Sequence, residues 1–266
     1  MKKNLFGTIL LLISIFCFDS IADAATRSRA EYEKTGRVIW EVNTKQKIVA
    51  ITFDDGPHPV FTPQILEILA KHDAKATFFV TGLKAGTYPD LLKREVREGH
   101  EIANHTFHHF HGNIASSKLS SELIETDKMI KQVTGLTPKL YRPVGGYYSD
   151  VIINTALQNG KTVILWSWDQ DSRDWTEPPA NQMYRYIKKG IKPGNIILFH
   201  DWHGSELTQS CSTVKALDKI LDYLDENGYK SVTVSELLYH STQFIPEAFE
   251  IYPLKKEKTS HIDIMY

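Results

Sequence analysis

The stretch from residue 48 to residue 57 reads IVAITFDDGP and places two adjacent carboxylates, Asp54 and Asp55, at the end of an apolar, β-branched run. A run of this kind followed by a Gly-Pro break is typical of a buried strand that ends at a turn. Burying two like charges is unfavourable unless a cation or a proton lies beside them. The pair therefore predicts a metal ion, an arginine or a shared proton, which the rest of the chain should supply.

The chain has 266 residues, which is enough for one sizeable core in a single α/β barrel. Its 31 basic and 32 acidic residues give a net charge of −1, so no basic surface is expected for nucleic acid or an anionic membrane. We therefore expect a neutral or locally recognised ligand, no nucleic-acid partner and no stable protein partner.

Residues 1–24 have the pattern of a signal peptide, because two lysines precede a short apolar run and small residues follow it. The run is too short to favour a membrane-spanning helix, although an uncleaved N-terminal anchor is the alternative. Cys17 lacks the small preceding residue expected of a lipoprotein cysteine. Removal of the signal would leave Cys211 as the only thiol, so no internal disulfide is expected. The predicted location is secreted or associated with the cell envelope.

Apolar runs and amphipathic segments alternate along the rest of the chain. The expected strands cover residues 48–53, 76–80, 101–104, 139–142, 162–167, 196–200 and 230–234. The expected helices cover residues 63–72, 90–98, 120–134, 149–159, 180–189, 213–227 and 235–239. Strands that are each followed by a helix predict a parallel sheet, and about seven of them fit a barrel better than an open sheet. We expect an N-terminal extension at residues 25–45, one domain at 46–240 and a tail at 241–266.

Chemically active side chains collect directly after these expected strands. They are Asp54, Asp55, His105, Arg142, the segment Asp171–Trp175 and His200. Active sites of α/β barrels form at the carboxyl ends of the strands, where residues from separate strands meet. The pattern therefore predicts one site built from all of these segments.

His105 and His109 are four residues apart, a spacing that places two imidazoles on one face of a helical turn or a tight loop. Two imidazoles and one carboxylate suit a divalent ion such as zinc, and three protein ligands leave a position for water. The alternative is a polar, His-rich loop without a metal, because His108 and His111 lie close by.

The later segments are ambiguous when each is taken alone. His200 could be a core or capping residue, Arg142 could be a surface salt-bridge partner, and Asp174 could be a loop aspartate beside a packing aromatic. The order of the segments is more specific. TFDDG at 52–56, HTFHH at 105–109, RP at 142–143, DSRDW at 171–175 and LFH at 198–200 resemble the five motifs of the polysaccharide deacetylases. This family is also known as the NodB homology domain or carbohydrate esterase family four.

The resemblance covers about residues 46–240 and implies a distorted (β/α) barrel with fewer than eight regular units. It also implies a divalent metal, zinc first and cobalt as an alternative, held by Asp55, His105 and His109. Asp54 would then remain outside the metal shell as the general base for the attacking water.

The same resemblance implies roles for the later motifs. Arg142 would keep the base ionised and oriented, and His200 would protonate the departing sugar amine as an imidazolium. Asp174 would favour that charged form of His200. Leu198 would line the pocket that receives the methyl group of the acetyl substituent.

The third motif departs from the family pattern. Many members have an aromatic residue at the position of Gly145, and the backbone N–H there helps to form the oxyanion hole. Gly145 can still donate that N–H, but the missing ring opens one wall of the groove. Tyr147 or Tyr148 would be a replacement wall.

Four tryptophans lie near the motifs, and tryptophan rings can stack on sugar faces: Trp166, Trp168, Trp175 and Trp202. Trp166 alternates with apolar neighbours and is expected in the core. Trp175 and Trp202 lie beside the expected acid and are predicted to bind substrate.

The sequence thus predicts a metal-dependent hydrolase that removes N-acetyl groups from N-acetylglucosamine in peptidoglycan or a chitin-like polymer and releases acetate. One alternative is an O-acetyl esterase acting on a xylan-type polysaccharide, since the same centre could cleave an ester. The other is a barrel that binds carbohydrate without turnover, which the altered third motif suggests.

Overall fold

The computed structural model describes residues 27–202 and 211–242. The strands are β1 (Val38–Ile39), β2 (Ile48–Asp54), β3 (Ala76–Val80), β4 (Glu101–Asn104), β5 (Leu140–Tyr141), β6 (Thr162–Ile164), β7 (Ile196–His200) and β8 (Lys230–Ser231). The helices are α1 (Arg29–Thr35), α2 (Phe61–Lys71), α3 (Gly82–Thr87), α4 (Pro89–Arg97), α5 (Ser116–Thr134), α6 (Asp150–Gln158), α7 (Ala180–Gly190), α8 (Ser212–Glu226) and α9 (Val234–Tyr239). All seven predicted strands and all seven predicted helices are present, with boundaries shifted by a few residues.

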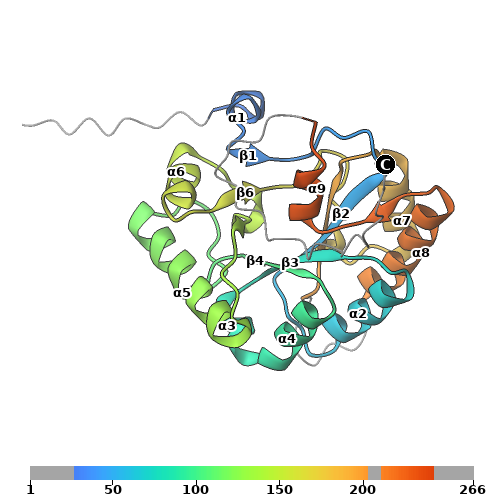
Figure 1. Cartoon of the computed structure of the whole chain (residues 1–266), viewed down its shortest axis with the longest axis horizontal. Coiled ribbons are helices and arrows are strands. Elements are labelled where there is room, and N and C mark those ends of the chain that lie inside the picture. Colours follow the sequence, from blue (N-terminus) through green and yellow to red (C-terminus); the bar gives the residue numbers. More distant parts are fainter. Residues whose placement is uncertain (1–26, 203–210, 243–266) are drawn as a thin grey trace, which may run out of the picture.

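The strands form one curled parallel sheet in the order β1-β6-β5-β4-β3-β2-β7, and β8 pairs with the start of β2. The two edges of the sheet approach each other. The N–H of Ser167, just beyond β6, donates a hydrogen bond to the carbonyl of Ile196 in β7 at 3.0 Å. The N–H of Val42, just beyond β1, donates to Gly194 at 2.9 Å. Figure 1 shows the helices arranged around this sheet. The structure confirms the predicted distorted (β/α) barrel.

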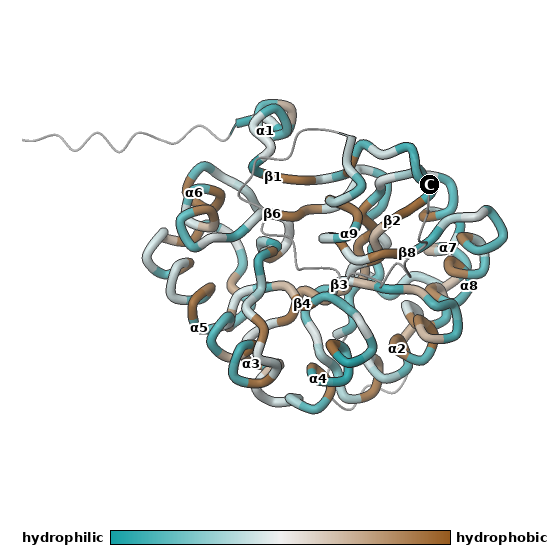
Figure 2. The backbone as a smooth tube through the Cα atoms, in the orientation of Figure 1, coloured by the Kyte–Doolittle hydropathy of each residue, from teal (hydrophilic) through white to brown (hydrophobic). Residues whose placement is uncertain are grey.

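Strand β2 is buried on both faces, as its nearly continuous apolar sequence predicts. Val49, Ile51 and Phe53 belong to a core shared with helices α2, α4, α7 and α8, whereas Ala50 belongs to a separate cluster inside the barrel. In Figure 2 the strands are mostly hydrophobic along their length, while the surrounding helices alternate between hydrophilic and hydrophobic segments. This pattern fits a sheet that is enclosed by amphipathic helices.

Helix α9 closes the end of the barrel at which the strands begin. Val234, Leu237 and Leu238 pack with interior residues of the sheet, among them Ala50 and Phe79. The side chain of Thr233 caps the helix by accepting a hydrogen bond from the N–H of Glu236 at 3.2 Å. With this end closed by apolar side chains, the polar interior residues lie toward the opposite end.

Three elements were not predicted: α1, β1 and α3. Helix α1 is stabilised by a capping box between Ser28 and Glu31, and β1 pairs with β6 through only two residues. Part of the predicted N-terminal extension therefore joins the sheet. A two-residue pairing is too short to give a strand pattern, and its apolar residues gain their partners only when the distant β6 folds beside them.

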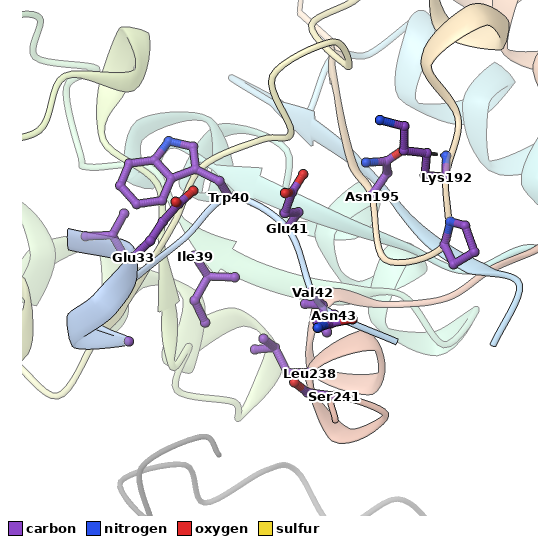
Figure 3. A pocket seen from close by; sticks show the side chains of 13 residues that line it. Glu33, Ile39, Trp40, Glu41, Val42, Asn43, Lys192, Asn195, Leu238 and Ser241 are labelled. Carbon is purple, nitrogen blue, oxygen red and sulfur yellow. Dashed lines mark hydrogen bonds between the residues drawn. The ribbon is translucent and has the colours of Figure 1, made fainter. Parts of the chain in front are cut away.

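Some predictions fall outside the described residues, namely the signal peptide at 1–24 and the tail beyond Thr242. Among the described helices, none combines the length and the apolar character needed to cross a membrane. A hollow of about 400 Å³ opens between α1, β1, α9 and the segment before β7, and it is lined by residues such as Trp40, Asn43 and Lys192 (Figure 3). None of the predicted site residues lines this hollow.

Candidate metal centre and active site

The predicted site residues meet where the strands end. Asp54 is the last residue of β2 and is in register with His200, the last residue of β7. His105 directly follows β4, and Arg142 directly follows β5. Parallel strands deliver their terminal residues to one edge, so residues separated by almost 150 positions in the sequence become neighbours.

Arg142 is fully buried and is the cation beside Asp54. Its Nη1 donates to Asp54 Oδ1 at 2.7 Å and to Thr52 Oγ1 at 2.8 Å. The other nitrogens, Nη2 and Nε, donate to the carbonyls of Leu165 at 3.0 Å and Ile164 at 3.2 Å. Burial lowers the pKa of Arg142, which Asp54 opposes, and a guanidinium remains protonated at neutral pH. Complete burial excludes the alternative of a surface salt bridge.

Asp55 points toward two imidazoles rather than toward the arginine. Its Oδ1 lies 2.7 Å from His109 Nε2 and 3.3 Å from His105 Nε2. One donor atom from each residue lies within 4.8 Å of the other two, and in the described part of the chain this is the only such group of three. Burial raises the pKa of Asp55, but His105 and His109 lower it by more, so it lies well below the usual range.

The donor set fits a divalent metal ion. The Nδ1 of His105 lies 2.8 Å from the carbonyl of Arg142, and since a carbonyl only accepts, Nδ1 carries the proton. In the neutral ring Nε2 is then left as the ligand atom, facing Asp55. Asp55 Oδ1 is buried and has no hydrogen bond of acceptable geometry despite the two nearby rings. A cation among these three atoms would satisfy that oxygen.

The two histidines lie in a tight loop and not in a helical turn. The backbone is left-handed at Asp55 (φ 78°), at Thr106 (φ 68°) and at His109 (φ 56°). Non-glycine residues rarely adopt this region, and such strain persists only where the surroundings enforce it. Two of the three predicted ligands therefore have strained backbones.

Glu122 of α5 holds this loop and was missed by sequence reasoning. Its Oε2 accepts hydrogen bonds from the backbone N–H groups of Phe107 at 2.9 Å and His108 at 2.8 Å, between the two predicted histidine ligands. Lys118 pairs with its other oxygen at 2.8 Å. A signal was available, because Glu122 interrupts the apolar face of a helix at a position where a buried residue is expected.

His200 and Asp174 form a second buried charge pair. The Nδ1 of His200 lies 2.7 Å from Asp174 Oδ1, and Oδ2 of the same carboxylate accepts from the backbone N–H of His200 at 2.8 Å and from Thr213 Oγ1 at 2.9 Å. Burial lowers the pKa of His200, but Asp174 outweighs this effect and raises it to about 9. Asp174 is 1% exposed and is thus not a surface loop residue.

Both glycines of the third motif have left-handed backbones, with φ of 66° at Gly145 and 69° at Gly146. A Cβ atom at Gly146 would lie 2.5 Å from the ring of Trp166, so no side chain fits there without movement. The turn is closed by the N–H groups of Gly146 and Tyr147, and within the described residues no hydrogen bond uses the N–H of Gly145.

The predicted substrate-binding residues differ in exposure. Leu198 is buried inside the barrel, two residues before His200, whereas Trp175 is 63% exposed. Trp202 is partly covered, since Lys84 Nζ lies 3.6 Å from the centre of its ring. These placements leave the three substrate-binding roles as predictions.

Two further charged groups beside the site were not predicted. Lys84 Nζ donates to the backbone carbonyl of Asp55 at 2.8 Å, and burial lowers its pKa to about 8. Asp201 is fully buried, which raises its pKa to about 7, and it accepts a hydrogen bond from Thr62 Oγ1 at 2.5 Å. A side chain at Gly56 would collide with this carboxylate, which explains the glycine after the aspartate pair.

Comparison with known proteins gives a consistent result. The profile of the family described as polysaccharide deacetylase matches residues 41–164. A peptidoglycan-N-acetylglucosamine deacetylase of Bacillus cereus is 44% identical over 211 residues, which cover 79% of this chain and 97% of that protein. A chitooligosaccharide deacetylase of Sinorhizobium fredii is 32% identical over 201 residues, covering 73% of this chain and 93% of the relative.

Solved structures agree with this assignment. A peptidoglycan N-acetylglucosamine deacetylase in complex with 4-naphthalen-1-yl-N-oxidanyl-benzamide has a TM-score of 0.74 at 30% identity, covering 82% of this chain and all of that one. A CE4 family pseudoenzyme from Bacillus anthracis has a TM-score of 0.68 at 30% identity, covering 76% and 68%. The fold, the motif order and these similarities show that the chain belongs to the polysaccharide deacetylase family.

Proposed function

We propose that this protein hydrolyses the N-acetyl groups of N-acetylglucosamine units in peptidoglycan, with chitin-like oligomers as a second substrate. The observation that carries the proposal is the separation of the two adjacent aspartates. Asp55 faces two imidazoles, while Asp54 is held by the buried guanidinium of Arg142. One carboxylate is placed to bind a metal, and the other is placed to move a proton.

Asp55, His105 and His109 would hold the divalent ion, and two nitrogens with one oxygen favour zinc, with cobalt as a substitute. When bound, the ion supplies Lewis acidity, which polarises the acetyl carbonyl and lowers the pKa of a water molecule. The rest of the chemistry falls to the protein's own side chains.

Asp54 would be the general base. Arg142 occupies its Oδ1 at 2.7 Å, whereas Oδ2 lies 3.8 Å from Nε2 of the ligand His105 and therefore faces the metal centre. A carboxylate fixed in this way can take a proton from water as the water attacks the acetyl carbon. The guanidinium holds Oδ1 in place, so the orientation of the carboxylate is fixed with Oδ2 toward the metal centre.

His200 would be the general acid. With a pKa raised to about 9 by Asp174, its ring is protonated at neutral pH. As the bond between the acetyl carbon and the nitrogen breaks, His200 would donate a proton to the nitrogen, and the products are acetate and a free amine. The N–H of Gly145 would bind the developing oxyanion, and Leu198 would contact the acetyl methyl group.

We also propose that the protein acts outside the cytoplasm, either secreted or attached to the cell envelope. The signal-like pattern of residues 1–24 supports this location, as does a substrate that is a component of the cell wall.

The test is an assay of acetate release from purified peptidoglycan, N-acetylglucosamine oligomers and acetylated xylan. Each is measured with and without a chelator, followed by addition of zinc or cobalt. We expect metal-dependent release from peptidoglycan and, more weakly, from the oligomers. Release from acetylated xylan alone would favour the O-acetyl esterase. Carbohydrate binding without metal-dependent release would favour the non-catalytic barrel, a possibility that a related pseudoenzyme makes concrete.

A further inference from the structure

A groove of about 320 Å³ opens beside Gly145 and Gly146, between helix α1 and the segment after β6. It is distinct from the hollow of Figure 3, although Trp40 lines both. Five aromatic rings and two guanidinium groups line the groove, among them those of Trp40, Trp166, Trp168 and Arg29. Of the residues that line it, the mechanism proposed above uses only the N–H of Gly145.

The groove adjoins two of the motifs that build the active site. Gly145 lines it and belongs to the third motif, and Asp171 lines it and belongs to the fourth. Asp171 also forms a backbone bridge with Leu198, and its carboxylate is close enough to His200 for their charges to interact. A ligand in the groove would therefore lie next to the group that is hydrolysed.

The glycine pair leaves room for aromatic rings at the border of this groove. A Cβ atom at Gly146 would meet the ring of Trp166 at 2.5 Å, and a Cβ atom at Gly145 would lie 3.1 Å from Tyr147. The aromatic residue expected at Gly145 in many relatives is absent here. In the third motif of this chain, the position of that aromatic ring therefore carries no side chain and borders the groove.

The walls combine flat apolar faces with polar edges. The ring of Trp168 is 78% exposed, and the guanidinium of Arg29 lies 6.0 Å from its centre and 5.1 Å from that of Trp40. Glu33 fixes Arg29 through an ion pair at 2.5 Å. Asp169 and Asp171 supply carboxylates on the same groove. Aromatic faces edged by hydrogen-bonding groups are suited to pyranose rings, which have an apolar face and a rim of hydroxyl groups.

We propose that this groove is a subsite for a further sugar unit of the substrate polymer, next to the unit that loses its acetyl group. The inference rests on the proposed function, because it takes its occupant from the same polysaccharide. The sugar stacks on Trp168, and its hydroxyls pair with Arg29 and Asp171. Helix α1 precedes residue 41, where the match to the family profile begins, so this subsite is contributed in part by a segment outside that match.

The subsite predicts that activity rises with chain length. In the metal-loaded protein, kcat/KM should be higher for the N-acetylglucosamine hexamer than for the N-acetylglucosamine monomer. Trp168→Ala and Arg29→Gln should each lower kcat/KM for the hexamer by about tenfold, mainly through KM, and leave kcat/KM for the monomer unchanged. Both residues are away from the metal ligands. Tyr239→Ala and Arg37→Gln are matched controls, since they remove an exposed aromatic and an exposed cation elsewhere.

A binding measurement separates this inference from the proposed function. The affinity for the hexamer and for glycan strands without stem peptides is measured by calorimetry. Both the parent protein and Trp168→Ala are used in the metal-free state. Weaker binding by the variant supports the subsite, even if no acetate is released. Normal acetate release with equal affinity and equal length dependence in Trp168→Ala would overturn the subsite and leave the proposed function standing. Equal effects of the control variants would also overturn it.

Discussion

The two ends of the barrel interior are built by the same strands and have opposite chemistry. Near the start of β2 the inward side chain is Ala50, which packs with α9, whereas two and four residues later it is Thr52 and then Asp54. Strand β7 changes in the same way, from Ile196 to His200. Apolar burial at one end can therefore stabilise a scaffold that holds buried charges at the other.

The largest effect is expected from variants that distinguish the roles of the two adjacent aspartates. Asp54→Asn should reduce kcat by about 10³-fold or more, because the base is lost, while metal binding stays nearly unchanged. Asp55→Asn is the matched control and should lose the metal. Acetate release and metal content by mass spectrometry distinguish the two variants. If Asp54→Asn retains most of its activity, Asp54 is not the base.

The second prediction concerns the buried ion pair between Arg142 and Asp54 at the polar end. Arg142→Met should lower the free energy of unfolding by about 3 to 5 kcal/mol, because it leaves Asp54 buried without its counter-charge. The double variant Arg142→Met with Asp54→Asn should recover part of that loss, since no uncompensated charge remains. Denaturant titrations measure both. Equal stability of the single variant and the parent would show that the pair contributes nothing.

At the apolar end, truncation should affect stability without affecting chemistry. Leu237→Ala in α9 should lower the free energy of unfolding by about 2 to 4 kcal/mol, because Leu237 is fully buried and a cavity would remain. Its kcat should equal that of the parent below the unfolding temperature. Leu83→Ala, at a position that is 55% exposed, is the control and should change stability little. A large loss of kcat in Leu237→Ala would mean that the two ends are not independent.

The smallest effect is expected for the titration of His200. Its pKa is about 9, above the usual value, so the stabilisation by Asp174 is complete below about pH 6.5 and is lost as the pH rises through 9. Asp174→Asn should lower this pKa toward 6.5, as measured by NMR of the metal-free protein. The alkaline limit of activity should move in the same direction. An unchanged pKa in the variant would contradict the pairing.

Local sequence was sufficient for the strands that carry the motifs. Strands β2, β3 and β7 consist of five or more residues that are mostly apolar or β-branched, so burial and backbone preference agree. Strand β1 was missed because its two pairing residues have no pattern of their own. Helix α3 was missed because it contains two glycines, and Gly82 is needed there to leave room for the ring of Phe107.

The same division applies to the site. Spacing and motif order predicted Asp55, His105 and His109 as metal ligands. Aspartate directly after a strand and two histidines four residues apart form a pattern that can be recognised in the sequence. Glu122 was harder to predict. An acidic residue on the apolar face of a helix indicates a buried carboxylate, but the sequence does not identify the backbone groups that it binds. The partners of Asp174 and Arg142 were inferred by resemblance, and their distances follow from the fold.

The sequence by itself determined the order of strands and helices and the residues that follow each strand, because these depend on local patterns of polarity and on turn residues. The pair of aspartates alone does not say which carboxylate faces which cation; the family resemblance suggested the assignment, and the tertiary structure gives its physical cause. Asp54 and Asp55 are identical in type and adjacent in the chain, and they differ because β2 ends between them. Asp54 keeps the inward direction of the strand toward Arg142, while the left-handed backbone of Asp55 turns its side chain toward His105 and His109.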